Sequence, residues 1–434
     1  MTRMIKNTDA LSQTQARKDA LRIAEVAYKS IDTRSAVSSA VSIKDDVLTV
    51  AGKTYTLSPE KNVWVVGAGK SSITAAYALE EVLGDRIAGG VIIDVEDTGN
   101  YLPLKKIQTF IGTHPVPSEQ NIESAKHLRD TLSSLGEDDV VIVLVSGGGS
   151  TLLCLPEPPV TVETEIAVFE ELTDAGASIE EMNTVRKHLS LVRGGRIAET
   201  AYPARVIGII FSDVPGNDIE FISSGPTVRD NTTVDDALAV IKKYNVRALD
   251  GLHLMETPKD DKYFARVHNE LLVTNTRALQ AMAREAVSLG YIPKIVTDRF
   301  SGEAREIASQ VLDELDNSEK GTVLLYGGES TVTLTHEAGK GGRSQEMALS
   351  ALTRIRDDEL LMPFSSDGHD NTENAGALCD NITKAHASEH ALMISEYLDA
   401  HRSYDFFTKL GDALITGYTG ANVSDLIIAL KNRA

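Results

Sequence analysis

Residues 322–345 read TVLLYGGESTVTLTHEAGKGGRSQ, and this stretch decides the expected fold. A β-rich run over 322–326 stops at a glycine pair. A second β-rich run over 331–335 leads into a glycine cluster that ends at Arg343, and a helical pattern begins there. Glycine turns between a strand and a helix let backbone N–H groups and the helix dipole bind an anion, and Arg343 adds a planar fork for carboxylate or phosphate oxygens. The stretch therefore predicts an α/β fold with an anion site. An ordinary hairpin and loop is the alternative.

Short β-branched runs alternate with helical patterns along the rest of the chain, and most of these runs end in Gly, Ser, Asp or Asn. Apolar strands separated by helices indicate parallel sheets that are covered on both faces. Ligands of such sheets bind beyond the carboxyl ends of the strands, where the glycine and acidic clusters of this chain lie. The candidate strands are 63–66, 90–94, 109–112, 140–146, 206–212, 271–274, 294–297, 323–326, 362–366 and 413–416.

Length and composition describe an acidic globular protein. The chain has 434 residues, enough for two or three domains, and a formal net charge of −20. This charge argues against nucleic acid and anionic membrane surfaces as partners. Two widely separated cysteines exclude a disulfide framework and a Cys-rich zinc site, and no run approaches the length of a membrane span. The first 31 residues lack a signal-peptide pattern and predict an amphipathic helix, so we expect a cytoplasmic protein.

A domain boundary is expected in the stretch 244–266, which is polar, contains Pro258 and has no strand period. We accordingly expect an N-terminal domain over residues 1–255 and a C-terminal domain over 256–434. A long surface loop inside one domain is the alternative.

The stretch 65–72, VVGAGKSS, predicts a strand, a glycine turn and a helix start, with Lys70 at the junction. A P-loop is excluded because its first glycine would fall on Trp64. The dinucleotide pattern GxGxxG would need a third glycine where Ser72 stands. The spacing thus supports an anion site without naming a nucleotide, and a surface lysine after a turn is the alternative. The residues expected at this site are Gly67, Gly69, Lys70 and Ser71.

Two further stretches also suit anions. After the most apolar candidate strand, 146–151 reads SGGGST, where three glycines let N–H groups converge into a nest. The stretch 183–196 gathers four cations and one histidine, His188, on a predicted helix and the turn after it. Partners of the helix dipole are the alternative for these cations, and a structural histidine is the alternative for His188. The expected binding residues are Ser146, Gly147, Gly148, Gly149, Ser150, Lys187 and Arg193.

Carboxylates follow two candidate strands, in SDVPGND from Ser212 and in SSDGHD from Ser365. Mg²⁺ requires only one or two protein oxygens when phosphates and water complete its octahedron. We therefore expect a metal site at Asp213 and Asp367, with Asx-turns as the alternative.

Taken together, these motifs resemble a known family. The stretches GAGKSS, THPVPSEQN, SGGGST, NTVRKHLS and SDVPGND are similar to the amino-terminal domain of the two-domain glycerate 2-kinases. The stretches GGRSQE, SSDGHDNTENAGALCD and TGYTGANVSDL resemble the carboxy-terminal MOFRL domain of that family. The motifs occur in order from about residue 15 to the end of the chain.

The resemblance implies an α/β fold of two α/β domains with the active site in an interdomain cleft. The larger N-terminal domain would hold a Rossmann-like parallel sheet with helices on both faces, and the MOFRL domain a smaller mixed sheet with helices. It also implies an enzyme that transfers the γ-phosphoryl group of ATP to the 2-hydroxyl of D-glycerate with Mg²⁺ or another divalent cation. D-Glycerate and ATP would be the partners, and a homodimer is one option.

The resemblance implies that Lys70 and Arg343 line the cleft between the domains, and we expect them to act as cationic clamps. The phosphate nest is Ser146 to Ser150, and Asp213 is preferred to His188 as the base. Glu329 and Asn275 complete the expected binding residues. Two other functions stay open: an NAD(P)-dependent hydroxypyruvate reductase with Asp94 or Glu96 as its ribose partner, and a non-catalytic sugar-acid binding protein.

Overall fold

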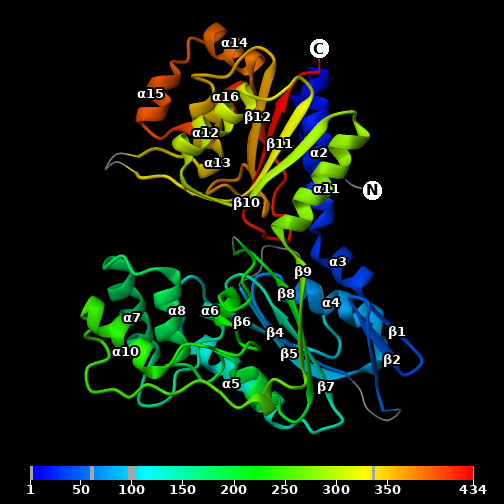
Figure 1. Ribbon diagram of the computed structural model, residues 1–434, viewed down its shortest axis with the longest axis vertical. Helices are drawn as coiled ribbons and strands as arrows, with labels where there is room; N and C mark the ends of the chain where they lie inside the picture. The colour runs from blue at the N-terminus through cyan, green and yellow to red at the C-terminus, as the bar shows by residue number, and fades with distance from the viewer. Residues whose placement is uncertain (1–2, 59–62, 96–102, 215, 335–337, 434) are drawn as a thin grey trace. The chain divides into compact units, whose positions relative to one another are not determined.

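The computed structural model describes residues 3–58, 63–95, 103–214, 216–334 and 338–433. Its contacts divide the chain into two compact units, each a sheet with helices packed against it (Figure 1). The amino-terminal unit comprises Thr33–Ser212 and Asn217–Val273, and the carboxy-terminal unit comprises Met1–Asp32, Asp213–Gly216 and Thr274–Ala434.

The amino-terminal unit contains a six-stranded sheet in the order β6-β5-β4-β7-β8-β9, and every neighbouring pair is parallel. Helices cover both faces of this sheet (Figure 1), which confirms the parallel sheet expected from the apolar strands. Because β5 and β6 lie on one side of β4 while β7 to β9 lie on the other, the strand order reverses between β4 and β7. The strands are β4 (Val63–Ala68), β5 (Ile87–Val95), β6 (Gln108–Gly112), β7 (Val140–Val145), β8 (Arg205–Phe211) and β9 (Val267–Val273).

Two smaller parts complete this unit. A three-stranded antiparallel sheet, which the sequence did not predict, is formed by β1 (Val41–Lys44), β2 (Val47–Val50) and β3 (Lys53–Thr56). A separate apolar core is formed between α7 (Val162–Asp174), α8 (Ile179–Lys187) and α10 (Val234–Tyr244). The other helices are α3 (Thr33–Ala40), α4 (Ser72–Leu83), α5 (Glu119–Ser133), α6 (Gly149–Leu152) and α9 (Arg196–Ala201).

The carboxy-terminal unit has a mixed sheet in the order β10-β11-β16-β12-β13-β15, with β14 paired to β12. Only the β10–β11 pair is parallel among the described pairs. Helices α2 and α11 lie on one side of this sheet, and α12 and α13 on the other (Figure 1). The strands are β10 (Ile292–Glu303), β11 (Thr322–Thr331), β12 (Glu359–Ser365), β13 (Gly376–Ala377), β14 (Cys379–Asp380), β15 (Ala413–Leu414) and β16 (Asp425–Lys431). The helices are α1 (Thr8–Leu11), α2 (Gln15–Ser30), α11 (Asn275–Ser288), α12 (Ala304–Asp316), α13 (Arg343–Ala351), α14 (Asn381–Glu389), α15 (Ile394–Asp399) and α16 (Ser403–Leu410).

The two units do not follow the expected boundary between residues 255 and 256. Residues up to Val273 belong to the amino-terminal unit, and residues 1–32 belong to the carboxy-terminal unit. β9 lies after that boundary, yet it completes the parallel sheet by pairing with β8. The amphipathic N-terminal helix is confirmed as α2, but it belongs to the carboxy-terminal unit. Its buried Arg17 forms ion pairs with Asp380 at 2.6 Å and Asp412 at 2.7 Å, and these pairs tie α2 to that unit.

One expectation about strands is wrong, and a buried strand was not predicted. The turn expected at Gly327 and Gly328 is instead the middle of β11, which pairs there with both β10 and β16 and continues to Thr331. Pairing on both sides satisfies the backbone of this glycine pair, so the strand does not end there. The sequence reading also missed β16, whose residues are buried throughout and which lies between β11 and β12.

Candidate active site

The loops that follow β4 and β7 meet at the point where the strand order reverses. The backbone N–H of Lys70 donates to the carbonyl of Gly147 at 2.9 Å, and the N–H of Ser71 donates to Ser146 Oγ at 3.2 Å. A Cβ atom on Gly69 would lie 2.5 Å from the Ser146 carbonyl oxygen, so only glycine permits this approach. In open parallel sheets the reversal point is where ligands bind. The two glycine turns predicted separately therefore form one loop pair.

The amino terminus of α4 is already occupied by a carboxyl group of the protein itself. Asp94, at the end of β5, accepts a hydrogen bond from Ile73 N–H at 3.0 Å and is 5% exposed. Burial raises the pKa of this carboxyl to about 7, although hydrogen bonds from Ile73 and Val95 oppose the rise. The helix start that was expected to bind a ligand anion is thus occupied by Asp94.

Lys70 and His114 flank the second glycine of the Ser146–Ser150 loop. A Cβ atom on Gly148 would lie 3.4 Å from Lys70 Cε and 3.4 Å from His114 Nε2. Desolvation, followed by the positive charges of Lys70 and Arg186, lowers the pKa of His114 to about 4. A neutral imidazole and two cations therefore surround this loop. His114 belongs to the THPVPSEQN motif, to which the sequence analysis assigned no role.

Buried charges support the end of the same loop. Arg193 Nη2 donates to the Ser150 carbonyl at 2.6 Å and to Glu165 Oε1 at 2.7 Å. Arg186 Nη2 donates to the same carbonyl at 3.3 Å. The hydroxyl of Ser150 shares a hydrogen bond with Ser224 at 2.9 Å. Arg193, which we predicted to bind substrate, hydrogen-bonds to the backbone of the loop. Its role in substrate binding stays a prediction.

The neighbouring basic residues also have protein partners. Lys187 is buried and lies 3.2 Å from Asp230 Oδ1. His188 is fully buried, with Nδ1 2.7 Å from the Thr184 carbonyl and Nε2 3.3 Å from Glu256. These contacts match the structural-histidine alternative for His188, and ligand binding by Lys187 stays a prediction.

In the carboxy-terminal unit, Arg343 is the first residue of α13 and lies among carboxylates. It forms an ion pair with Glu329, and its Nε lies 3.4 Å from Asp425 Oδ2. Burial lowers the pKa of Arg343, but the charges of Asp425 and Glu329 outweigh burial and raise this pKa above its usual value. Burial raises the pKa of Asp425 well above its usual range, and both of its oxygens lack a hydrogen-bond donor among the described residues.

The start of α13 is occupied in the same way as that of α4. Asp370 is buried and accepts hydrogen bonds from the backbone N–H groups of Ser344 at 2.9 Å and Gln345 at 2.8 Å. Burial raises the pKa of Asp370, although these hydrogen bonds oppose the rise. The N–H groups that were expected to bind an anion here are again hydrogen-bonded to a carboxyl group of the chain.

The two expected metal ligands adjoin one segment of the carboxy-terminal unit. Ser424 Oγ donates to the Asp213 carbonyl at 2.6 Å, and the N–H of Ser366, next to Asp367, donates to the Ser424 carbonyl at 3.2 Å. Asp367 Oδ1 accepts from Ser365 Oγ and His369 N–H, both at 2.9 Å, which is the Asx-turn alternative. Its Oδ2 receives no hydrogen bond from the described residues. In the described ranges no group of three or more His, Cys, Asp or Glu residues is arranged to hold a metal ion.

The remaining predicted site residues have structural surroundings. Gly67 lies within β4, and Gly149 begins α6. Asn275, the first residue of α11, donates to the Asp298 carbonyl at 2.6 Å and is 2% exposed. Glu96, one of the two expected ribose partners, lies outside the described residues.

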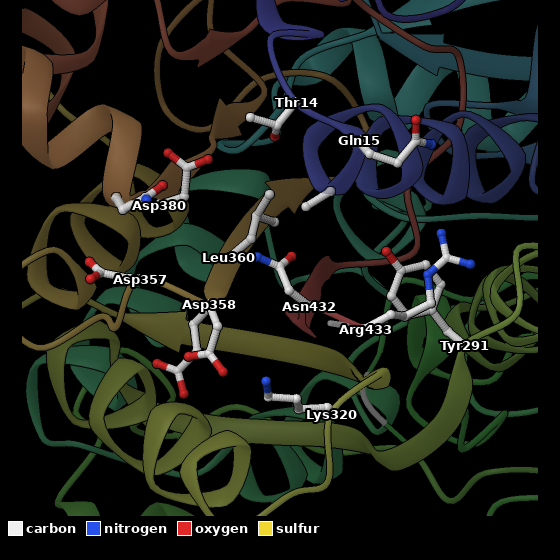
Figure 2. A pocket seen from close by; sticks show the side chains of 13 residues that line it. Thr14, Gln15, Tyr291, Lys320, Asp357, Asp358, Leu360, Asp380, Asn432 and Arg433 are labelled. Atoms are coloured by element: carbon white, nitrogen blue, oxygen red, sulfur yellow. The ribbon is translucent and has the colours of Figure 1, made fainter.

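The described residues of the carboxy-terminal unit border cavities at two places. One of about 320 Å³ lies beside Arg343 and is bordered by Ser330, the glycines of the stretch 339–342 and His401. The other, of about 490 Å³, lies where β10 and β12 begin and β16 ends, with charged side chains of both signs around it (Figure 2). Arg433, in its wall, contacts the Leu289 carbonyl and Asp19, and Asp380 pairs with Arg17. Arg433 and Asp380 thus already have partners within the protein, so we regard this cavity as a weaker candidate site.

Comparison with known proteins places the chain in a family. Residues 19–252 match a family described as a domain of unknown function, DUF4147, and residues 322–425 match the MOFRL family. The chain is 36% identical to the glycerate 2-kinase of Pyrococcus horikoshii, over 95% of this chain and 97% of that protein. The chain belongs to the two-domain glycerate 2-kinase family. This confirms the resemblance drawn from the motifs.

Other relatives agree on the fold and differ in name. The crystal structure of glycerate kinase from Thermotoga maritima has 32% sequence identity and a TM-score of 0.83, covering 95% of this chain and 99% of that one. A protein of Agrobacterium vitis that is 37% identical, over 85% of this chain and 87% of its own length, is named putative hydroxypyruvate reductase. No helix in the described part of the chain has the length and apolar character needed to cross a membrane.

Sequence reasoning did not find the buried groups of these sites. Asp94 was considered only as a ribose partner, Asp370 and Asp425 were quoted only within longer motifs, and Glu165 lies in none of the motifs. Each of the four contacts a residue that is distant in sequence. The one usable signal was position, since Asp94 lies at the end of a predicted strand.

Proposed function

We propose that this protein is a glycerate 2-kinase that transfers the γ-phosphoryl group of ATP to the 2-hydroxyl of D-glycerate. The observation that supports this most is the loop pair at the strand-order reversal, where Lys70 lies beside the Ser146–Ser150 loop. Relatives named glycerate 2-kinase extend over nearly the whole chain. Phosphoryl transfer mainly requires positioning and electrostatic stabilisation, which glycine turns and fixed cations supply.

In this proposal each group has a role that its chemistry suits. Lys70 and Arg343 neutralise the charge that spreads over the transferred phosphoryl group. Asp213 orients the 2-hydroxyl and accepts its proton, while N–H groups of the Ser146–Ser150 loop bind oxyanion oxygens. That residues of both units act on one substrate stays a prediction.

A divalent cation fits the acidic side chains of the carboxy-terminal unit. Asp367 has one carboxylate oxygen without a donor among the described residues, and the buried Asp425 has two. We propose that Asp213 and Asp367 hold Mg²⁺, which would neutralise charge on the phosphates when bound. Two protein oxygens suffice when phosphates and water complete the octahedron.

Two observations disfavour the reductase named for some relatives. The turn after β4 lacks the third glycine of the dinucleotide pattern, since Ser72 occupies that position. Asp94, an expected ribose partner, is buried against the start of α4 and bonded to Ile73.

The deciding experiment is coupled ATP turnover with D-glycerate and Mg²⁺, with the product identified by phosphorus NMR. We expect 2-phosphoglycerate to form and no NADH or NADPH to be oxidised in the presence of hydroxypyruvate. Reduction of hydroxypyruvate without ATP turnover would establish the reductase. Binding of D-glycerate without either reaction would establish a binding protein.

A further inference from the structure

We propose that Arg186 binds a small oxyanion of a substrate, either the carboxylate of the acid or a phosphate of the nucleotide, beside the Ser146–Ser150 loop. This inference rests on the proposed function and adds to it a binding residue that was not among the expected site residues. It is carried by the balance of buried charges, by the position of Arg186 and by its Nε–H donor, which is unpaired among the described residues.

Buried positive charge exceeds buried negative charge beneath the loop. Arg186 and Arg193 lie 3.7 Å and 2.7 Å from the same carboxylate oxygen of Glu165, which is 2% exposed. Burial raises the pKa of Glu165, but the charges of Arg193 and Arg186 outweigh burial and hold this pKa below its usual value. Glu165 therefore contributes one negative charge. Cys154 also contacts Glu165, but burial raises the pKa of its thiol to about 12 and keeps it neutral. Two guanidinium groups therefore share one counter-charge.

An unbalanced buried charge is costly, so its retention needs a reason. Burial and the charge of Arg193 lower the pKa of Arg186 to about 10, which leaves it protonated at neutral pH. Its buried Nε has no acceptor among the described residues. An oxyanion would supply both the missing charge and an acceptor, and guanidinium groups suit carboxylate and phosphate geometry.

Position distinguishes Arg186 from Arg193. The side chain of Arg193 is 0% exposed, whereas that of Arg186 retains 10% exposure. Arg186 contacts the Ser150 carbonyl, while Lys70 and His114 lie beside Gly148 of the same loop. The charges of Lys70 and Arg186 both lower the pKa of His114. Lys70, His114 and Arg186 thus border the loop from different elements, and Arg186 is the guanidinium that a ligand there can reach.

The test compares Arg186→Gln and Arg186→Lys with the wild type in steady-state kinetics and in thermal unfolding. For Arg186→Gln we expect the KM of one substrate, D-glycerate or ATP, to rise about 10- to 100-fold while the other changes little. The substrate that responds identifies the oxyanion as a carboxylate or a phosphate. Arg186→Lys should recover part of the loss because it retains the charge without the fork.

Thermal unfolding without ligand separates ligand binding from a structural role. Removing an unbalanced charge should leave the melting temperature of Arg186→Gln unchanged or raise it, while the stabilisation by D-glycerate or by inorganic phosphate is lost. Arg205→Gln, at the opposite end of the same sheet, is the matched control and should retain the ligand effect. A lower melting temperature with unchanged KM for both substrates would overturn the inference. If the wild type turns over no ATP with D-glycerate but its ligand stabilisation still depends on Arg186, the proposed function fails and the inference stands.

Discussion

The starts of helices α4 and α13 share one construction and differ in the charges around them. Each follows a glycine turn, each has a cation at the turn, and each has its N–H groups occupied by a buried aspartate, Asp94 or Asp370. In the amino-terminal unit two buried guanidinium groups share the single carboxylate Glu165. In the carboxy-terminal unit Arg343 lies between the carboxyl groups of Glu329 and Asp425.

This difference shows that a glycine-rich helix start does not determine the charge of a ligand. The dipole of each helix is already satisfied by an internal carboxylate, so side chains brought in from other elements set the local field. The amino-terminal loop is suited to an oxyanion, and the acidic surroundings of Arg343 are suited to a cation.

Lys70→Ala should lower kcat by about three orders of magnitude without unfolding the protein, since in the proposed function Lys70 stabilises the transferred charge at the loop pair. Turnover of D-glycerate and far-ultraviolet circular dichroism measure the two properties. Lys126→Ala, an exposed lysine on α5, is the control and should leave both unchanged. Activity close to that of the wild type in a folded Lys70→Ala protein would remove Lys70 from the site.

Asp367→Asn should lower kcat by about two orders of magnitude and raise the Mg²⁺ concentration needed for half-maximal rate, because an amide is a weaker ligand than a carboxylate. A Mg²⁺ titration of the initial rate measures both, with Asp213→Asn expected to behave alike. Thermal stability should change far less than activity. Full activity in excess EDTA would contradict the cation-binding role of this unit.

Arg343→Lys should lower kcat/KM about tenfold although the charge is retained. A lysine cannot span Glu329 and Asp425 with a planar fork, so its charge would be held less firmly. Steady-state kinetics with D-glycerate measure the effect. Arg354→Lys, on an exposed pair with Asp313, is the matched control and should retain the wild-type rate. If both substitutions behave alike, the geometry around Arg343 is unimportant for catalysis.

Asp94→Asn should change the pH dependence of stability. Asp94 has a folded-state pKa of about 7 against 3.8 for an unperturbed carboxyl, so the folded state retains a proton that the unfolded state loses. The free energy of unfolding therefore falls as pH rises from about 4 to 7, by about 1 kcal/mol per pH unit from this group. Asp94→Asn should remove that slope.

Denaturant unfolding at several pH values measures this slope, and the fluorescence of Trp64, the single tryptophan, reports on the amino-terminal unit. Asp130→Asn, at an exposed position on α5, should keep the wild-type slope. Equal slopes in the Asp94 variant and the wild type would show that the start of α4 holds an ordinary ionised carboxylate.

The sequence by itself determined much of the amino-terminal unit, because its strands are apolar throughout and end at glycine or acidic turns. Strands β4, β7 and β8 lie within a residue or two of their predicted bounds, and the helix starts at α4 and α13 were also predicted. Local propensity and turn chemistry suffice for such elements because the signal lies within a few residues. The family was likewise identified from the order of its motifs.

Tertiary structure alone decided which groups meet. The sequence indicated a turn at Gly327, but pairing with β10 and β16 keeps that residue within β11. Asp94 and Asp370 reach helix starts that lie 21 and 26 residues away from them in sequence. Glu165 neutralises one of two guanidinium groups whose local sequence shows only a basic stretch. Charge balance in a buried site is a sum over distant residues, and it is fixed only when the chain folds.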